Sequence, residues 1–406
     1  MKKKIELLSP VGDWERLEVA IAYGADAVYL AGNLFGMRSF SGNFGEGVLD
    51  KAVAYAHERG VKVYVTCNTM PRNEEVALLP SWLEYLAEVG VDAVILADVG
   101  VLALAKRHAP SVDIHISTQA SIVNYAAANM YHDLGAKRVI LARELSLAEI
   151  IDLKANVSPE LELEAFVHGS MCMSYSGRCL ISSFMTGRDA NRGACAQPCR
   201  YQYGLVEERR EGEVFSIVEE AGETFLLNSR DLSMIDHVEE LTQVGIDSLK
   251  IEGRAKSAYY AAVITGAYRQ ALDAVARGEA LDPVWRNEVY NVSHREYSTG
   301  FFYGEPGQYV KSSGYFCDWK VVAIVTACEE NGRATLTLRN KFAKGEEVDI
   351  VGPDVKPFSM IVGDLWEESG EILEEVRHPE MVFYLNLPQK VPAYSMVRRK
   401  IENPEK

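Results

Sequence analysis

The chain has 406 residues, of which 48% are apolar and 25% charged, as in globular proteins that bury a sizeable core. Its formal net charge of −16 argues against non-specific binding to nucleic acid, which needs a broadly basic surface. We find no secretory signal and no apolar run of about 18 residues, so we expect a cytoplasmic protein without membrane spans. In a reducing compartment, clustered cysteines are typical of metal or redox sites rather than disulfides.

A pattern recurs along the first 255 residues, in which a helical stretch ends at a glycine and a short apolar strand follows. A helix commonly ends at such a glycine because the backbone there is left-handed. The glycines are Gly24, Gly60, Gly90, Gly135 and Gly245. With three further apolar stretches, eight strands are predicted. They include Ile5, Ala27, Val61, Ala93, Ile114, Val139, Leu163 and Ser248.

Each predicted strand is an almost continuous apolar run, which is typical of parallel strands buried on both faces. Eight helix-linked strands in about 250 residues predict an α/β fold of the TIM-type (β/α)8 barrel class, with an open doubly wound sheet as the alternative. The carboxyl ends of the strands form the active face of such a barrel. The polar residues expected there are Ser9, Asn68, Asp98, Gln119, Arg143, Glu144, His168, Glu252 and Arg254. We expect Ser9 and Asp98 to cap helices.

A second domain is predicted after the barrel. Asn331-Gly332 separates two alternating strands, which is a strong hairpin signal, and further short strands follow. We therefore expect a small C-terminal all-β barrel, a fold that by itself assigns no function. The predicted domains are a TIM-like barrel over residues 1–280, a cysteine-rich segment at 172–200 inserted after the seventh strand, an aromatic-rich connector over 281–315 and the β-barrel domain over 316–403.

Four of the seven cysteines lie in this cysteine-rich segment, as Cys172, Cys179, Cys195 and Cys199. Their spacing lacks the closely spaced cysteine pairs of a structural zinc site. It also lacks the compact three-cysteine loop of radical enzymes that cleave S-adenosylmethionine. Small residues and arginines flank the thiols and suit an iron–sulfur cluster, because backbone N–H groups can approach the sulfides. Zinc binding and reactive or disulfide-bonded thiols stay open as alternatives.

The same segment is net positive within an acidic protein. Its charged residues are Arg178, Arg188, Asp189, Arg192 and Arg200. We expect either solvated arginines or a patch that faces phosphate or carboxylate groups.

The stretch from Glu164 to Ser182, EAFVHGSMCMSYSGRCLIS, resembles the signature of peptidase family U32, the collagenase-like proteins. Segments such as LKIEGRAKSAYY and SHREYSTGFFYG resemble that family in the expected order, and RNKFAKGEEVDIVGP resembles its C-terminal β-barrel extension. Some members of the family are recorded as collagenases or proteases. Others are oxygen-independent hydroxylases that carry a 4Fe-4S cluster bound by four cysteines.

The length and domain content resemble the branch that makes 5-hydroxyuridine at the tRNA wobble position with prephenate. This resemblance implies a 4Fe-4S cluster on Cys172, Cys179, Cys195 and Cys199, with prephenate as co-substrate and tRNA as partner. The alternatives are a collagenase-like peptidase, a hydroxylase of ribosomal RNA or of a small aromatic compound, and a subunit that works only with a homologous partner chain.

The hydroxylase interpretation gives roles to individual residues. Guanidinium groups would bind the carboxylates of prephenate, His168 or Glu252 would move protons, and aromatic rings such as Tyr175, Tyr201 or Phe301 would stack on a splayed-out base. Arg398, Arg399 and Lys400 would contact phosphate. The candidate catalytic residues are His168, Glu252 and Arg254, and the candidate substrate-binding residues are Arg143, Arg230, Glu144, Asn68, Gln119 and Tyr175.

A peptidase needs an activated nucleophile or a metal-bound water. The sequence has no His-Glu-x-x-His motif and no Gly-x-Ser-x-Gly motif after a strand. Cys172 with His168 is the candidate pair for a cysteine protease. A cysteine that binds a cluster cannot also attack a peptide, so the two interpretations exclude each other at Cys172.

Overall fold

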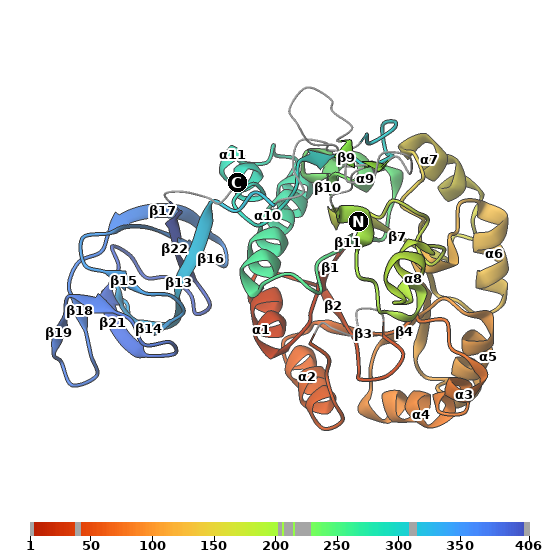
Figure 1. Ribbon diagram of the computed structural model, residues 1–406, viewed down its shortest axis with the longest axis horizontal. Helices are drawn as coiled ribbons and strands as arrows, with labels where there is room; N and C mark the ends of the chain where they lie inside the picture. The colour runs from red at the N-terminus through yellow and green to blue at the C-terminus, as the bar shows by residue number, and fades with distance from the viewer. Residues whose placement is uncertain are drawn as a thin grey trace. The chain divides into compact units, whose positions relative to one another are not determined.

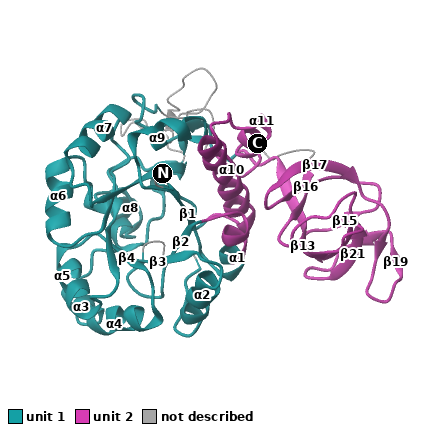
Figure 2. Cartoon of the chain, turned by 180° about the vertical axis from the view of Figure 1, so that it is seen from behind, with its two compact units in different colours: residues 1–17, 26–255, 295–315 teal, residues 18–25, 256–294, 316–406 magenta. Residues whose placement is uncertain are grey.

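The structure is a computed structural model that divides into two compact units (Figure 2). Helix α10 (Ala258–Arg277) belongs by its contacts to the second unit, so the observed division differs from the predicted domain boundary at residue 280. The described residues are 4–36, 42–201, 205–206, 214–215, 229–307 and 315–401. Unit 1 contains residues 1–17, 26–255 and 295–315, and unit 2 contains residues 18–25, 256–294 and 316–406.

Eight parallel strands of unit 1 close into a barrel (Figure 1). Neighbours in the chain pair with each other, and β11 pairs with both β1 and β7, which closes the sheet. The predicted TIM-type fold is therefore confirmed. The strands are β1 (Glu6–Pro10), β2 (Ala27–Leu30), β3 (Lys62–Cys67), β4 (Ala93–Leu96), β5 (Asp113–Ile116), β6 (Arg138–Ile140), β7 (Glu162–Ser170) and β11 (Ser248–Ile251).

The helices of this unit end as the sequence predicts. All five predicted glycines have a positive φ, between 73° and 103°, which a residue without Cβ adopts at little cost. Asp98 caps α5, because its Oδ1 accepts hydrogen bonds from the backbone N–H groups of Gly100 and Val101. The predicted cap at Ser9 is wrong, because β1 continues through Pro10. The helices are α1 (Trp14–Ala22), which runs from unit 1 into unit 2, α2 (Val48–His57), α3 (Asn73–Val76), α4 (Leu79–Val89), α5 (Val99–His108), α6 (Tyr125–Asp133), α7 (Leu147–Asn156) and α9 (Val238–Val244).

Strand β7 is longer than its neighbours and continues beyond the barrel. Its last residues pair antiparallel with β10 (Asp231–Ser233), which pairs in parallel with β12 (Tyr297–Ser298). The cysteine-rich segment leaves the carboxyl end of β7, so it starts on the active face of the barrel. Within and after this segment the elements are α8 (Ile181–Thr186), the 3-10 turns η2 (Ala190–Arg192) and η3 (Pro198–Arg200), and the short strands β8 (Leu205–Val206) and β9 (Val214–Phe215).

Unit 2 contains α10, α11 (Pro283–Glu288) and an antiparallel all-β domain, as predicted. Strands β13 and β14 form the predicted hairpin around Gly332, where φ is 87°. In the described part of the chain, no helix combines the length and apolar character that a membrane crossing requires. The strands are β13 (Trp319–Cys328), β14 (Arg333–Leu338), β15 (Phe342–Ala343), β16 (Glu347–Gly352), β17 (Val355–Ile361), β18 (Leu365–Trp366), β19 (Ile372–Leu373), β20 (Glu375–Val376), β21 (Val382–Asn386) and β22 (Met396–Lys400).

Arg398 of β22 lies inside unit 2 rather than on its surface. Its Nη1 lies 2.5 Å from Glu288 Oε2, and its Nη2 lies 2.8 Å from Glu288 Oε1. The hydroxyl of Tyr259 and the ring of Trp319 cover the same guanidinium. The predicted phosphate contact at Arg398 is therefore wrong, because a buried bidentate ion pair already occupies this side chain. Arg399 forms an ion pair with Glu346.

Candidate active site

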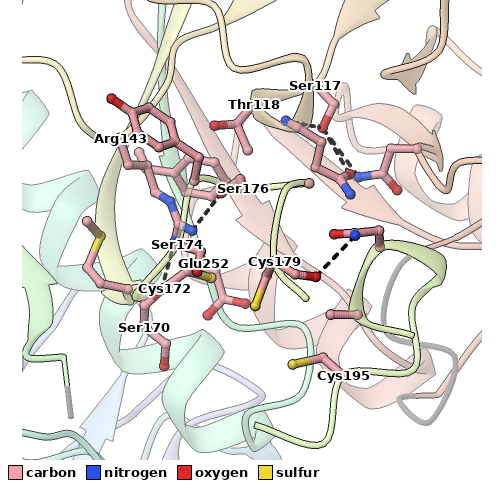
Figure 3. A pocket seen from close by; sticks show the side chains of 18 of the residues that line it. Ser117, Thr118, Arg143, Ser170, Cys172, Ser174, Ser176, Cys179, Cys195 and Glu252 are labelled. Carbon is pink, nitrogen blue, oxygen red and sulfur yellow. Dashed lines mark hydrogen bonds between the residues drawn. The ribbon is translucent and has the colours of Figure 1, made fainter. Parts of the chain in front are cut away.

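A cavity of about 190 Å³ lies at the carboxyl ends of the barrel strands, under the cysteine-rich segment (Figure 3). Five of the polar residues predicted at strand ends line it together, although they come from three different strand ends and a 3-10 turn. They are Asn68, Gln119, Arg143, Glu252 and Arg254. Tyr175 lines the cavity as well and is half-exposed. The structure thus gathers most of the predicted substrate-binding residues around one space.

All four cysteines of the segment line this cavity, and none forms a disulfide. Burial raises the pKa of the Cys199 thiol, and the nearby charge of Arg200 lowers it. The charges of the other three thiols raise the pKa of Cys199 as well. The four sulfurs are therefore close enough to act on one another electrostatically. Figure 3 shows Cys172, Cys179 and Cys195 beside Glu252 in this cavity.

The arrangement of the four thiols can be compared with the two metal sites that the sequence left open, a zinc site and an iron–sulfur cluster. Among the described residues, no three His, Cys, Asp or Glu side chains converge as the ligands of one metal ion must. A zinc ion needs such convergence on a single point. In a 4Fe-4S cluster each cysteine binds a different iron, so its thiols surround a volume instead. Four thiols around one cavity fit a cluster better than they fit zinc.

Barrel side chains hold the loop between the first two cysteines in place. Arg143 donates from Nη1 to the carbonyl oxygen of Ser170 at 2.9 Å and from Nη2 to the Oγ of Ser176 at 2.8 Å. Ser121 donates from its Oγ to the carbonyl oxygen of Ser176 at 3.2 Å. Burial opposes the charge on Arg143, but Cys172 and two nearby carboxylates outweigh burial and raise the pKa of this guanidinium. Arg143 is therefore a fixed cation beside the first cysteine.

Gly177 allows this loop to lie directly on the turn η1 (Thr118–Ala120). Its φ is +79°, and a Cβ built there would lie 2.7 Å from the carbonyl oxygen of Gln119. Contacts under 3.0 Å essentially never occur for real Cβ atoms. Any side chain at this position would therefore push the cysteine loop away from the barrel.

A chain of hydrogen bonds orients the amide of Gln119. Asn68 donates from Nδ2 to the Oγ of Ser117 at 3.4 Å, and Ser117 donates from Oγ to the Oε1 of Gln119 at 3.3 Å. The Nε2 of Gln119 is buried and makes no hydrogen bond within the described structure. A buried donor of this kind gains free energy from an acceptor on a ligand.

Three predicted site residues do not line the cavity. His168 lies inside β7, which continues to Ser170, and its Nε2 lies 3.1 Å from the hydroxyl of Tyr297. Arg230 forms an ion pair with Glu296 at 3.5 Å. Burial raises the pKa of Glu144, while Arg143 next to it lowers that pKa. The predicted stacking residues Tyr201 and Phe301 also lie outside the lining.

Lys250 of β11 lines the cavity and escaped the sequence analysis. Its Nζ lies 2.9 Å from the Oε1 of Glu164 and 4.4 Å from the ring centre of Tyr29. Burial lowers the pKa of this lysine, and Glu164 partly restores it. A lysine within the apolar strand SLKI was the available signal, because a charge inside a barrel strand must be paired or functional.

Comparison with known proteins gives two family matches. Residues 12–312 match the model described as peptidase family U32, and residues 318–398 match the peptidase family U32 C-terminal domain. The chain is 37% identical to tRNA hydroxylation protein P1 of Bacillus subtilis over 98% of this chain and 95% of that protein. It is 41% identical to an uncharacterized protease of Methanocaldococcus jannaschii over 75% of this chain and 74% of that protein. It is 38% identical to a 23S rRNA 5-hydroxycytidine synthase of Escherichia coli over 67% of this chain and 40% of that protein.

Proposed function

The chain belongs to peptidase family U32, and we propose that it is an RNA hydroxylase that forms 5-hydroxyuridine at the wobble position of tRNA. A relative of nearly the same length is named a tRNA hydroxylation protein. The observation that carries the proposal is the shared cavity, in which the four cysteines face the polar residues of the strand ends. Cofactor and substrate would then meet in one place.

In this proposal Cys172, Cys179, Cys195 and Cys199 hold a 4Fe-4S cluster. When bound, the cluster supplies electron-transfer chemistry that does not need molecular oxygen. Arg143 offsets the thiolate charge and fixes the loop through Ser176. The backbone N–H of Gln197 donates to the Sγ of Cys195 at 3.4 Å, a contact of the kind that tunes cluster ligands.

The charge of the cavity favours a small acid as co-substrate. Among the described lining residues, the guanidinium groups of Arg143, Arg200 and Arg254 outnumber the one carboxylate, that of Glu252, while Lys250 is already paired with Glu164. A dicarboxylate such as prephenate offers partners of the charge and shape that guanidinium groups bind. We assign Arg254 to carboxylate binding and Glu252 to proton transfer. Arg254 is held by the Oδ1 of Asn43, which accepts from its Nη2 at 2.9 Å.

The RNA base would enter beside Tyr175, where its ring can stack on the phenol. The oriented Nε2 of Gln119 would donate to a carbonyl oxygen of the base. The peptidase alternative needs His168 beside Cys172. His168 instead contacts Tyr297 and does not line the cavity, so no observed geometry favours that alternative.

The test uses protein purified without oxygen, tRNA that carries an unmodified wobble uridine, and prephenate. We expect about four irons per chain, and we expect 5-hydroxyuridine in the digested tRNA only when prephenate is added. Cys179→Ala should lose iron and product, whereas Cys317→Ala, at an exposed cysteine outside the cavity, should keep both. Gelatin or peptide cleavage by an iron-free protein that leaves the tRNA unchanged would overturn the proposal.

A further inference from the structure

The cysteine-rich segment exposes several large apolar side chains at the edge of the cavity. Leu180 is 67% exposed, Phe184 91% and Met185 55%. Leu180 and Phe184 are four residues apart and therefore lie on the same side of α8. Ile181 and Ser182 point the other way, since Ile181 lines the cavity and Ser182 is buried. Leu180 and Phe184 thus face solvent on the side of α8 opposite the buried Ser182, and Met185, four positions after Ile181, is exposed at the end of the helix.

Phe184 and Leu180 are the two most exposed large apolar side chains on the described surface. Phe184 has almost its whole ring in water, although soluble proteins rarely leave adjacent large apolar groups uncovered. Tyr175, which lines the cavity, adds a half-exposed aromatic ring from the same loop. The apolar face is continuous in sequence with Cys179 and Ile181, which line the cavity, so whatever covers it lies next to the cavity lining.

Positive charges outnumber negative ones on this part of the segment, where Asp189 accepts a hydrogen bond from the backbone N–H of Asn191. Arg178 and Arg188 are both exposed. Each uses its Nε in a hydrogen bond to the protein, with the Oγ of Ser121 and the carbonyl oxygen of Ala194 respectively. These bonds anchor two exposed guanidinium groups in a chain whose net charge is −16. Arginines can contact the phosphates of a polyanion, and apolar or aromatic side chains beside them can pack against unpaired bases. Single-stranded RNA offers both kinds of group.

We propose that Tyr175, Arg178, Leu180, Phe184, Met185 and Arg188 form a docking surface for single-stranded RNA, here called the rim surface. This inference rests on the proposed function, because it places the nucleotides next to the reacting base on the rim surface. A base that enters the cavity from a single-stranded loop keeps its neighbours at the entrance. A second protein chain seated there would cover the entrance that the RNA needs.

The rim surface would bind the RNA without base-specific hydrogen bonds, and therefore without preference for its sequence. Phe184 and Tyr175 offer rings on which any base can stack, and the arginines contact phosphates. The choice of base would then fall to groups inside the cavity, such as the amide of Gln119. The rim surface would supply affinity, and the cavity would supply selectivity.

The test measures binding of the full, cluster-loaded chain to a fluorescent anticodon stem-loop RNA with a wobble uridine. Phe184→Ala should weaken binding about 5- to 150-fold, which corresponds to the loss of one base stack. Met185→Ala should also weaken it, whereas Met130→Ala, a methionine of α6 that is 57% exposed and outside the cavity, should not. Arg188→Gln should reduce the slope of log Kd against log salt by about 0.7, the value for one phosphate contact on a single strand.

Iron content and the thermal midpoint, measured on every variant, show whether a loss of binding reflects a local effect. Unchanged RNA binding in Phe184→Ala, Met185→Ala and Arg188→Gln overturns the rim surface, even if the protein still makes 5-hydroxyuridine. Loss of a protein complex in sedimentation, with RNA binding unchanged, would identify a partner chain as the occupant and also overturn it. If the unaltered protein neither binds nor hydroxylates RNA, the proposed function is wrong, and the rim surface, which rests on it, is wrong as well.

Discussion

Gly177→Ala tests whether the contact between the cysteine loop and the barrel positions the cluster ligands. The substitution has two separable effects. The first is the left-handed backbone at φ +79°, which costs about 1–2 kcal/mol for a residue with a Cβ. The second is the approach of that Cβ to 2.7 Å from the carbonyl oxygen of Gln119, which forces the loop back by several tenths of an ångström. A site of this kind tolerates errors of only about 0.5 Å.

Gly187→Ala is the matched control, because it isolates the first effect. Gly187 also has a left-handed φ, of +69°, and lies in the same segment, but nothing lies within 4 Å of a Cβ built there. We expect both variants to lose similar stability and only Gly177→Ala to lose most of its iron. The assay is iron and acid-labile sulfide per chain after anaerobic reconstitution, with thermal melting alongside. Equal iron content in the two variants would refute the argument that this contact positions the ligands.

Two further predictions concern stability. Glu288→Ala removes the bidentate partner of the buried Arg398 guanidinium and leaves Asp349, 3.3 Å from Nη2, as its remaining carboxylate. Urea denaturation should therefore show a loss of stability toward the lower end of the range of about 3–5 kcal/mol found when a buried pair is broken. A loss below about 1 kcal/mol would contradict the importance of this pair. Burial, and then Arg138 and Lys250, lower the pKa of His115 well below its ordinary 6.5, so the folded protein binds fewer protons there than the unfolded chain. Stability should therefore fall as the pH drops below about 6.5. Urea denaturation of His115→Gln at several pH values should show a smaller fall in the free energy of unfolding. An identical pH dependence in the variant would rule out His115 as the cause.

The sequence predicted the barrel because its signals are local. Each glycine at a helix end and each apolar strand reflects a requirement of a few neighbouring residues, and Gly135 with Val139 shows both within five positions. The C-terminal hairpin at Gly332 was predictable for the same reason. In a closed barrel, strand ends that are far apart in the chain converge, so Asn68 and Glu252 could be assigned to one site without a structure.

The errors arose where tertiary packing decides the outcome. Arg398 looks like a basic surface residue in the sequence, and only its contact with Glu288, 110 positions away, shows that it is buried. The sequence predicts His168 at the end of a strand, but pairing with β10 extends β7 to Ser170 and places His168 beside Tyr297. No local pattern encodes these long-range partners.

A buried ion network connects the strands that carry the site. Arg138 of β6 bonds to Glu6 of β1 and to Glu164 of β7, and Glu164 also accepts from Lys250 of β11 at 2.9 Å. Buried ion pairs of this kind contribute little net stability, because desolvation offsets most of their attraction. Their geometric demand is strict, however, and they join β6, β7 and β11 in the observed register. Those strands lead directly to Arg143, to the cysteine-rich segment and to Glu252, so the network below the cavity sets the relative positions of the groups within it.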